Sequence, residues 1–191
     1  YDALMDLAGI LNIPPKALSL NGELGLAFGS RGKGGKRAAA AHYERDTTGQ
    51  VTPNRVVINL TREHGAGSLA HEWFHAVDNY FARIRGEKAG MLTEKPYPNG
   101  EGIRPEMVVA FRDLMKAITS TGVMARSRNL DKKRTKDYWS TGLEMAARSF
   151  ESYVIAKLHE QNAANDYLAN IVPEESYLRE EEYPYPKAAE M

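Results

Sequence analysis

Apolar residues follow two different spacings along this chain, one typical of helices and one typical of strands. In residues 1–12 the apolar positions Leu4, Leu7, Ala8 and Leu11 repeat with helical spacing and stop before two prolines. Similar spacing returns in three later segments. We therefore expect helices over residues 1–12, 105–120 and 139–161, and a further helix that is introduced by residues 65–68 and runs to about residue 85.

Three short, largely apolar runs predict strands over residues 24–28, 39–43 and 56–60, and the last of them is rich in β-branched residues. A glycine-rich basic loop, residues 29–37, separates the first two and favours a hairpin, beside which an extended peptide could pair. A helix, then a small sheet, then further helices is the order typical of an α+β fold. We expect a small, mostly antiparallel sheet packed on the helix that follows it.

The chain of 191 residues has a length typical of one domain, and no linker divides it. Residues 86–103 are rich in Gly and Pro and predict a surface excursion, and an acidic, tyrosine-rich tail starts at Pro173. The first residue is Tyr1 rather than Met, which suggests a piece of a longer polypeptide. No apolar run is long enough for a membrane span and no signal peptide is visible, so we expect a soluble, cytoplasmic domain.

The composition restricts the chemistry of any metal site. Lys and Arg together number 25, as do Asp and Glu, so the net charge does not attract the chain to nucleic acid or anionic lipid. There are no cysteines, which excludes disulfides, thiolate ligands and a cysteine nucleophile. Metal ligands must therefore come from His, Asp and Glu.

The segment His71-Glu72-Trp73-Phe74-His75 matches the His-Glu-x-x-His pattern of zinc peptidases and falls within a predicted helix. Four residues advance a helix by about 400°, so both imidazoles lie on one face, one turn apart. Glu72 is offset to the side of this pair, where its carboxylate can accept a proton from a zinc-bound water. We predict His71 and His75 as Zn²⁺ ligands and Glu72 as the general base of a hydrolase of the zincin type.

A catalytic zinc usually has three protein ligands, so one is still to be found. His42, His64, His159 and the carboxylates are all candidates. Glu144 and Glu151 are seven residues apart on one predicted helix and project in nearly the same direction. Glu144 also fits a capping box with Thr141, in which it would bond the helix backbone instead of a metal.

Other residues are candidates for supporting roles. Asp78 lies on the histidine face and could orient a ligand imidazole, or be a solvated helix residue. Glu151 is expected at the surface beside Arg148 or behind a metal ligand, and Tyr153 is among the tyrosines that could contact substrate. Residues 126–136 carry excess positive charge that could contact nucleic acid weakly. The candidates there are Lys132, Lys133 and Arg134.

Several of these segments resemble the large polyvalent-protein-associated domains of phages and conjugative elements. The resemblance rests on residues 26–32, 41–44, 57–61 and 65–80, and it continues through Tyr138-Trp139 and Glu144 to Tyr153. It implies a metallopeptidase within a very long protein of a mobile element. The segment 144–150 is also similar to the helix that supplies a glutamate ligand in related small zincins, which favours Glu144 as the third ligand. The number of residues between His75 and Glu144 is larger than in the most compact of these peptidases, which implies that residues 86–137 are an insertion.

The sequence thus predicts a single zincin-like domain that hydrolyses peptide bonds, with a protein of the host or of the mobile element as its substrate. The rival hypothesis is a zinc-stabilised module of a DNA-transfer protein that binds nucleic acid or protein and cleaves nothing. Glu72 favours the enzyme, because a purely structural zinc site does not need a carboxylate that activates water.

Overall fold

The protein is described by a computed structural model that covers residues 1–29, 40–46, 55–62, 64–86, 90–94 and 104–191. Within these ranges the fold is α+β, as the sequence predicted, with five α-helices and a small three-stranded sheet. The predicted surface excursion at 86–103 and the basic loop at 29–37 lie largely outside the described residues. None of the described helices has the length and apolar character needed to cross a bilayer.

The sheet is mixed rather than mostly antiparallel. Strand β3 (Val57–Leu60) lies in the centre, parallel to β1 (Gly25–Phe28) and antiparallel to β2 (Ala41–Glu44). The predicted hairpin between the first two strands is therefore wrong. All four residues of β3 are buried, whereas β1 and β2 are partly exposed, so the most apolar strand takes the central position although it comes last in the chain.

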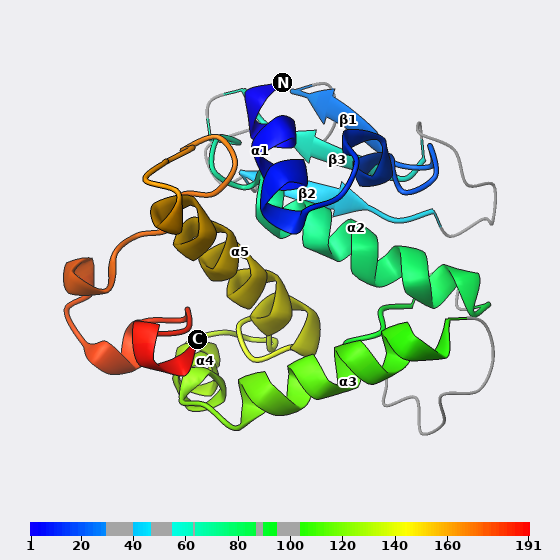
Figure 1. Cartoon of the computed structure of the whole chain (residues 1–191). Coiled ribbons are helices and arrows are strands. Elements are labelled where there is room, and N and C mark those ends of the chain that lie inside the picture. The colour runs from blue at the N-terminus through cyan, green and yellow to red at the C-terminus, as the bar shows by residue number, and fades with distance from the viewer. Residues whose placement is uncertain (30–39, 47–54, 63, 87–89, 95–103) are drawn as a thin grey trace.

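Helix α2 (Leu69–Ile84) lies against the sheet, and α5 (Gly142–Glu160) packs against α2 (Figure 1). Helix α1 (Asp2–Leu11) and residues of α2, β3 and α5 bury a common apolar core, in which Leu7, Ile58 and Ala70 are at most 1% exposed. The indole nitrogen of Trp73 donates a hydrogen bond to the carbonyl of Leu18 at 3.0 Å. This core fixes one side of α2 and leaves its histidine side free for α5.

A second core joins α2 and α5 to α3 (Pro105–Thr119) and α4 (Val123–Asp131). The expected insertion, residues 86–137, thus contributes two helices that pack on the helices of the site. Helix α4 was not predicted, because its buried residues include only one apolar side chain. They are Val123, Ser127 and Asp131, spaced four apart.

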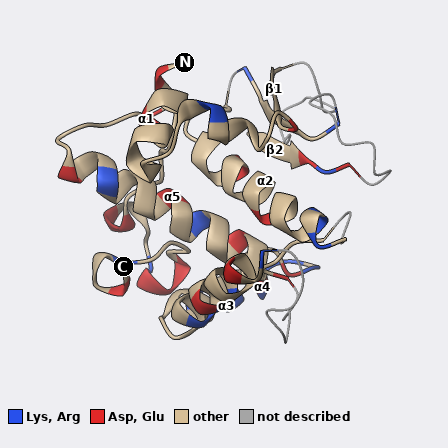
Figure 2. Cartoon of the chain, turned by 45° about the vertical axis from the view of Figure 1, so that its right-hand side comes forward, with Lys and Arg blue, Asp and Glu red and all other residues tan. Residues whose placement is uncertain are grey.

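The acidic tail forms three short 3-10 turns, of which Glu180–Glu182 packs against α4, and it ends near that helix (Figure 1). Acidic and basic positions are intermingled along the described helices (Figure 2), as expected for a chain whose charges balance.

Candidate metal centre

The two histidines project from the first half of α2, which starts in a tight turn. Gly67 has a φ of +85° and lies so close to the segment after α5 that a β-carbon would come within 2.6 Å of Asn170. The backbone of this turn bonds the same segment: Gly67 accepts from the Asn170 amide at 3.1 Å, and Ala70 donates to Leu168 at 2.9 Å. These contacts fix the start of α2, and hence the direction of the helix turn that carries His71 and His75.

The imidazoles of His71 and His75 lie one turn apart, as predicted, with ring centroids separated by 4.8 Å and planes at 82°. Glu144, in the first turn of α5, reaches both rings: its Oε2 is 3.4 Å from Nε2 of His71 and its Oε1 is 3.5 Å from Nε2 of His75. Ligand atoms from these three residues all lie within 4.8 Å of one another. The predicted ligand set is therefore brought together by two helices that are distant in sequence.

The geometry and chemistry of this cluster fit a zinc ion. In a tetrahedral site with zinc–ligand bonds of about 2.0–2.1 Å, neighbouring ligand atoms are about 3.3 Å apart. Each histidine nitrogen lies near that separation from one of the two Glu144 oxygens, and single ligand atoms from the three residues lie within 4.8 Å of one another. Oε2 of Glu144 is buried and makes no hydrogen bond within the described structure. Two imidazoles and a carboxylate are a donor set typical of catalytic zinc.

The capping-box alternative for Glu144 is wrong. Thr141 stands at the N-cap of α5, but its hydroxyl donates to the carbonyl of Tyr138 at 2.8 Å and makes no cap to the helix. The Glu144 side chain is turned towards the histidines instead.

Glu151 lies on the other side of the His71 ring, with its Oε2 3.5 Å from Nδ1. It is only 4% exposed, so the surface alternative is wrong. Burial alone would lower the pKa of His71, but the two flanking glutamates outweigh it and raise the pKa to about 10. Burial tends to raise the pKa of Glu144, yet the two histidines bring it well below its usual value. In the metal-free protein, the two flanking carboxylates therefore favour the protonated form of His71.

Glu72 is buried, and that burial raises the pKa of its carboxyl group, opposed by the positive charges of His71 and His75. The charge of His42, on strand β2, acts in the same direction as these two histidines. His42 is hydrogen bonded to Glu44 at 3.0 Å, and it is not part of the cluster that could hold a metal.

Asp78 is fully buried, so the solvated alternative is wrong for this residue. Its carboxylate accepts from the amide and the hydroxyl of Thr93, and burial raises its pKa to about 6. A β-carbon on Gly142 would come within 2.6 Å of the Thr93 carbonyl, so this contact also abuts the start of α5. Asp78 is close enough for the charge of His75 to affect its pKa, but its hydrogen bonds go to the loop.

Two residues were missed or misplaced by sequence reasoning. Tyr138, considered only as one tyrosine among several, has its pKa raised by burial and then by the adjacent Glu144. Arg148, expected to pair with Glu151, is 2% exposed and has its Nη1 3.8 Å from Oε2 of Glu144. The four-residue spacing of Glu144 and Arg148 was a visible signal, since such residues are neighbours on a helix.

The remaining predicted residues lie elsewhere. Tyr153 is 40% exposed and lines a different cavity, together with Leu114 and Glu190. In the basic stretch, Lys133 forms an ion pair with Glu182 of the tail at 2.6 Å, and the Arg134 guanidinium lies 5.0 Å from the centre of the Tyr138 ring. Lys132 is exposed and bonds Asn129 at 3.3 Å.

Residues 130–191 match the family model described as large polyvalent protein-associated domain 1. This match confirms the resemblance seen in the sequence, over roughly the last third of the chain. The matched segment includes Glu144, Arg148 and Glu151. No curated protein and no solved structure matches the chain.

Proposed function

We propose that this chain is a zinc-dependent hydrolase domain with zincin-like packing that cleaves peptide bonds. The observation that supports it most directly is the convergence of His71, His75 and Glu144 with a buried Glu72 in the same helix turn. A zinc site that served structure alone would not require a second acidic side chain beside its three ligands.

His71, His75 and Glu144 would hold the ion. Zinc so bound lowers the pKa of a coordinated water towards neutrality and polarises a carbonyl oxygen. Glu72 is the proton carrier: it accepts a proton from water as the oxygen attacks the carbonyl carbon, and delivers it to the nitrogen as the C–N bond breaks. The raised pKa of Glu72 suits this role, because a base must also be able to release its proton.

A peptide is the substrate class that the surroundings favour. Among the described strands, β2 lies at an edge of the sheet, packs against α2 and carries His42 within electrostatic range of Glu72. An extended peptide pairing with such an edge would bring its backbone carbonyls alongside the catalytic helix. The family match to a polyvalent protein-associated domain supports, as part of the proposal, a host or element protein in the bacterial cytoplasm as the target.

The non-catalytic alternative has less support. The charges that suggested nucleic-acid binding are partly engaged within the chain, since Lys133 pairs with Glu182 and Arg134 stacks on Tyr138. Arg126 is also directed at the acidic tail.

The proposal is tested by separating metal binding from turnover. In Glu72→Gln the zinc affinity, measured by competition with a chelator, should stay near the wild-type value, while cleavage of a fluorescence-quenched peptide library should fall at least about 100-fold. Glu144→Ala should instead lose zinc. Glu160→Gln, an exposed glutamate later in α5, is the matched control and should change neither property. Full activity in Glu72→Gln, or a wild-type domain that binds no zinc, would overturn the proposal.

A further inference from the structure

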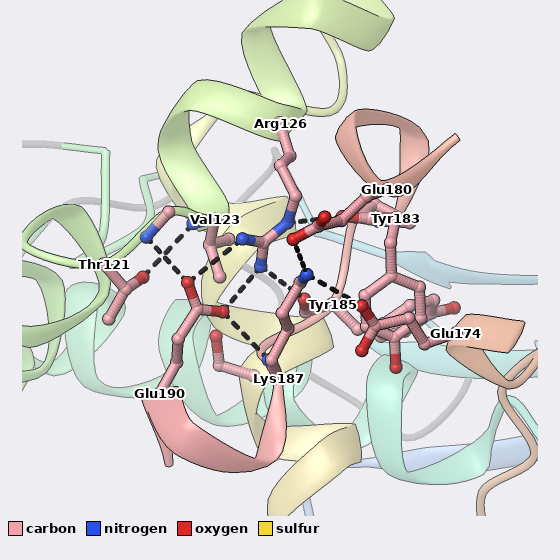
Figure 3. A network of polar contacts seen from close by, with 12 residues as sticks. Thr121, Val123, Arg126, Glu174, Glu180, Tyr183, Tyr185, Lys187 and Glu190 are labelled. Carbon is pink, nitrogen blue, oxygen red and sulfur yellow. Dashed lines mark hydrogen bonds and ion pairs between the residues drawn. The ribbon is translucent and has the colours of Figure 1, made fainter. Parts of the chain in front are cut away.

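Residues 183–190, close to the end of the chain, which we term the strap, are bound to α4 by one arginine. Arg126 donates from Nε to the carbonyl of Tyr183 at 2.8 Å and from Nη2 to that of Tyr185 at 2.9 Å. The same guanidinium forms a two-pronged ion pair with Glu190, at 3.0 and 2.6 Å (Figure 3). The Arg126 side chain therefore binds three residues of the strap.

Glu190 holds the strap in place from its own end. Besides pairing with Arg126, it accepts from the amide of Gly122 at 2.8 Å and from the amide of Lys187 at 2.9 Å. Lys187 in turn pairs with Glu174 at 2.7 Å and also with Glu180, earlier in the tail (Figure 3). A carboxylate that satisfies a guanidinium and two backbone amides at once holds its segment in one geometry.

The inner side of the strap contacts a second arginine, Arg148 of α5. Its Nε donates to the carbonyl of Pro184 at 3.2 Å, and its Nη2 donates to the carbonyl of Trp139. Its Nη1 has no hydrogen-bond partner and lies 3.8 Å from Oε2 of Glu144, an acceptor that is equally buried and without a hydrogen bond. Arg148 thus links the strap to the proposed third zinc ligand.

We propose that the strap holds Arg148 against Glu144, so that Arg148 is a positioning residue and strap closure sets the zinc affinity of the centre. This inference rests on the proposed function. The planar guanidinium has a fixed set of donors, and two of them are committed to backbone carbonyls on either side of it. The direction of the third donor, and hence the charge presented to Glu144, depends on Pro184 together with Trp139 and the Ser127 hydroxyl, which lies 3.4 Å from Nη2.

Release of the strap has a defined consequence. Without the Pro184 carbonyl, a buried guanidinium loses an acceptor, which favours movement of the side chain or entry of water. The carboxylate of Glu144 then loses the fixed positive charge beside Oε2, the oxygen that also faces His71. Residues that orient metal ligands in this way typically change affinity by about 10- to 100-fold when they are replaced.

The test compares two tail glutamates that each pair with a cation of the α4 region. Glu190→Ala removes the strap fastening, whereas Glu182→Ala removes the Lys133 ion pair without contact to the strap's inner side. Zinc affinity is measured by chelator competition on variants shown to be folded by circular dichroism. We expect Glu190→Ala to bind zinc about tenfold more weakly than wild type and Glu182→Ala to be unchanged.

A double-mutant cycle then shows whether Arg148 carries the effect. Arg148→Lys keeps the charge but cannot reach both carbonyls and Glu144, and should itself weaken zinc binding about tenfold. In that background Glu190→Ala should cause no further loss, because the strap acts through the missing guanidinium. Equal zinc affinity in wild type and folded Glu190→Ala would overturn the proposed role of the strap. Simple additivity of the two losses of zinc affinity in the double variant would overturn it as well. No zinc binding by wild type would instead remove the proposed function as well.

Discussion

Nδ1 of His71 lies 3.5 Å from Oε2 of Glu151, on the opposite side of the ring from the nitrogen that faces the proposed metal position. A proton on Nδ1 directed at this carboxylate leaves Nε2 as the free donor atom. Glu151, two turns along α5 from Glu144, would thus set the tautomer of His71 as a proposed zinc ligand.

Glu151→Gln should weaken this arrangement without destroying it. The amide oxygen can still accept from Nδ1, but the negative charge that increases the basicity of the ring is lost. We expect zinc affinity to fall about 10- to 100-fold, measured by chelator competition, with the thermal melting temperature of the metal-free protein recorded in parallel. Glu160→Gln, on the exposed end of the same helix, serves as the control. An affinity equal to that of wild type would exclude Glu151 from any role at the metal centre.

Zinc binding should become tighter as the pH rises. The pKa of His71 in the metal-free protein is raised to about 10, so at neutral pH its ring carries a proton that the metal must displace. Release of one proton makes the apparent zinc affinity increase about tenfold per pH unit below that pKa. Calorimetric titration in buffers of different ionisation enthalpy measures the number of protons released. Uptake of protons, or an affinity independent of pH, would contradict this prediction.

Gly142→Ala should disturb the centre through the backbone. A β-carbon at residue 142 would come within 2.6 Å of the carbonyl of Thr93. Asp78 holds the loop that contains Thr93 in place, so the start of α5 must shift instead. We expect a loss of roughly 1–3 kcal/mol in the free energy of unfolding together with weaker zinc binding, since Glu144 lies in the same turn. Chemical denaturation and chelator competition measure the two effects.

Gly9→Ala is the matched control for that variant. Gly9 lies within α1 with open space around its α-carbon, so alanine there should stabilise the fold by about 0.5–1 kcal/mol and leave zinc binding unchanged. If both variants behaved alike, contact with Thr93 would not be the cause.

Asp131→Asn should destabilise the loop that leads into α5. The carboxylate accepts hydrogen bonds from the amides of Tyr138, Trp139 and Ser140 and from the Ser140 hydroxyl, at 2.7–3.0 Å. An asparagine turns an NH₂ group towards one set of these donors, which should cost about 2 kcal/mol of stability near neutral pH.

The stabilisation that Asp131 provides should depend on pH, and the shift of its pKa gives the direction. Burial opposes ionisation of Asp131, but its hydrogen bonds lower the pKa below the ordinary value. The stabilisation is therefore present above the unfolded-state pKa and is lost as the pH falls through the folded-state pKa. Denaturation at neutral pH and at about pH 3 should show the gap between wild type and Asp131→Asn narrowing in acid. Asp113→Asn, on the exposed side of α3, should show no comparable gap at either pH.

Local patterns predicted the parts of this protein that depend on a single element. The spacing of His71 and His75 required only one helix turn, and the buried run at residues 57–60 required only its own composition. The helix over 105–119 followed from its amphipathic pattern in the same way.

The features that sequence reasoning missed depend on contacts between distant segments. Strand order is not encoded in any one strand, so β3 in the centre could not be distinguished from a hairpin of β1 and β2. The competing interpretations of Glu144 were separated only when α2 was seen beside it, because a cap and a ligand use the same residue at the same helix position. Arg148 resembles a surface residue until the tail covers it.

The division of the proposed metal centre between α2 and α5 means that the segment matched by the family model contains only part of the proposed ligand set. A fragment of residues 130–191 retains Glu144, Glu151 and Arg148 but lacks both His71 and His75. It also lacks the α2 surface on which Met145 and Ala146 are packed. Such a fragment should neither bind zinc tightly nor adopt the fold described above. A shared C-terminal segment in another polypeptide would therefore not by itself indicate a shared chemistry. The informative feature in a longer protein would be an upstream helix with two histidines one turn apart that complements it.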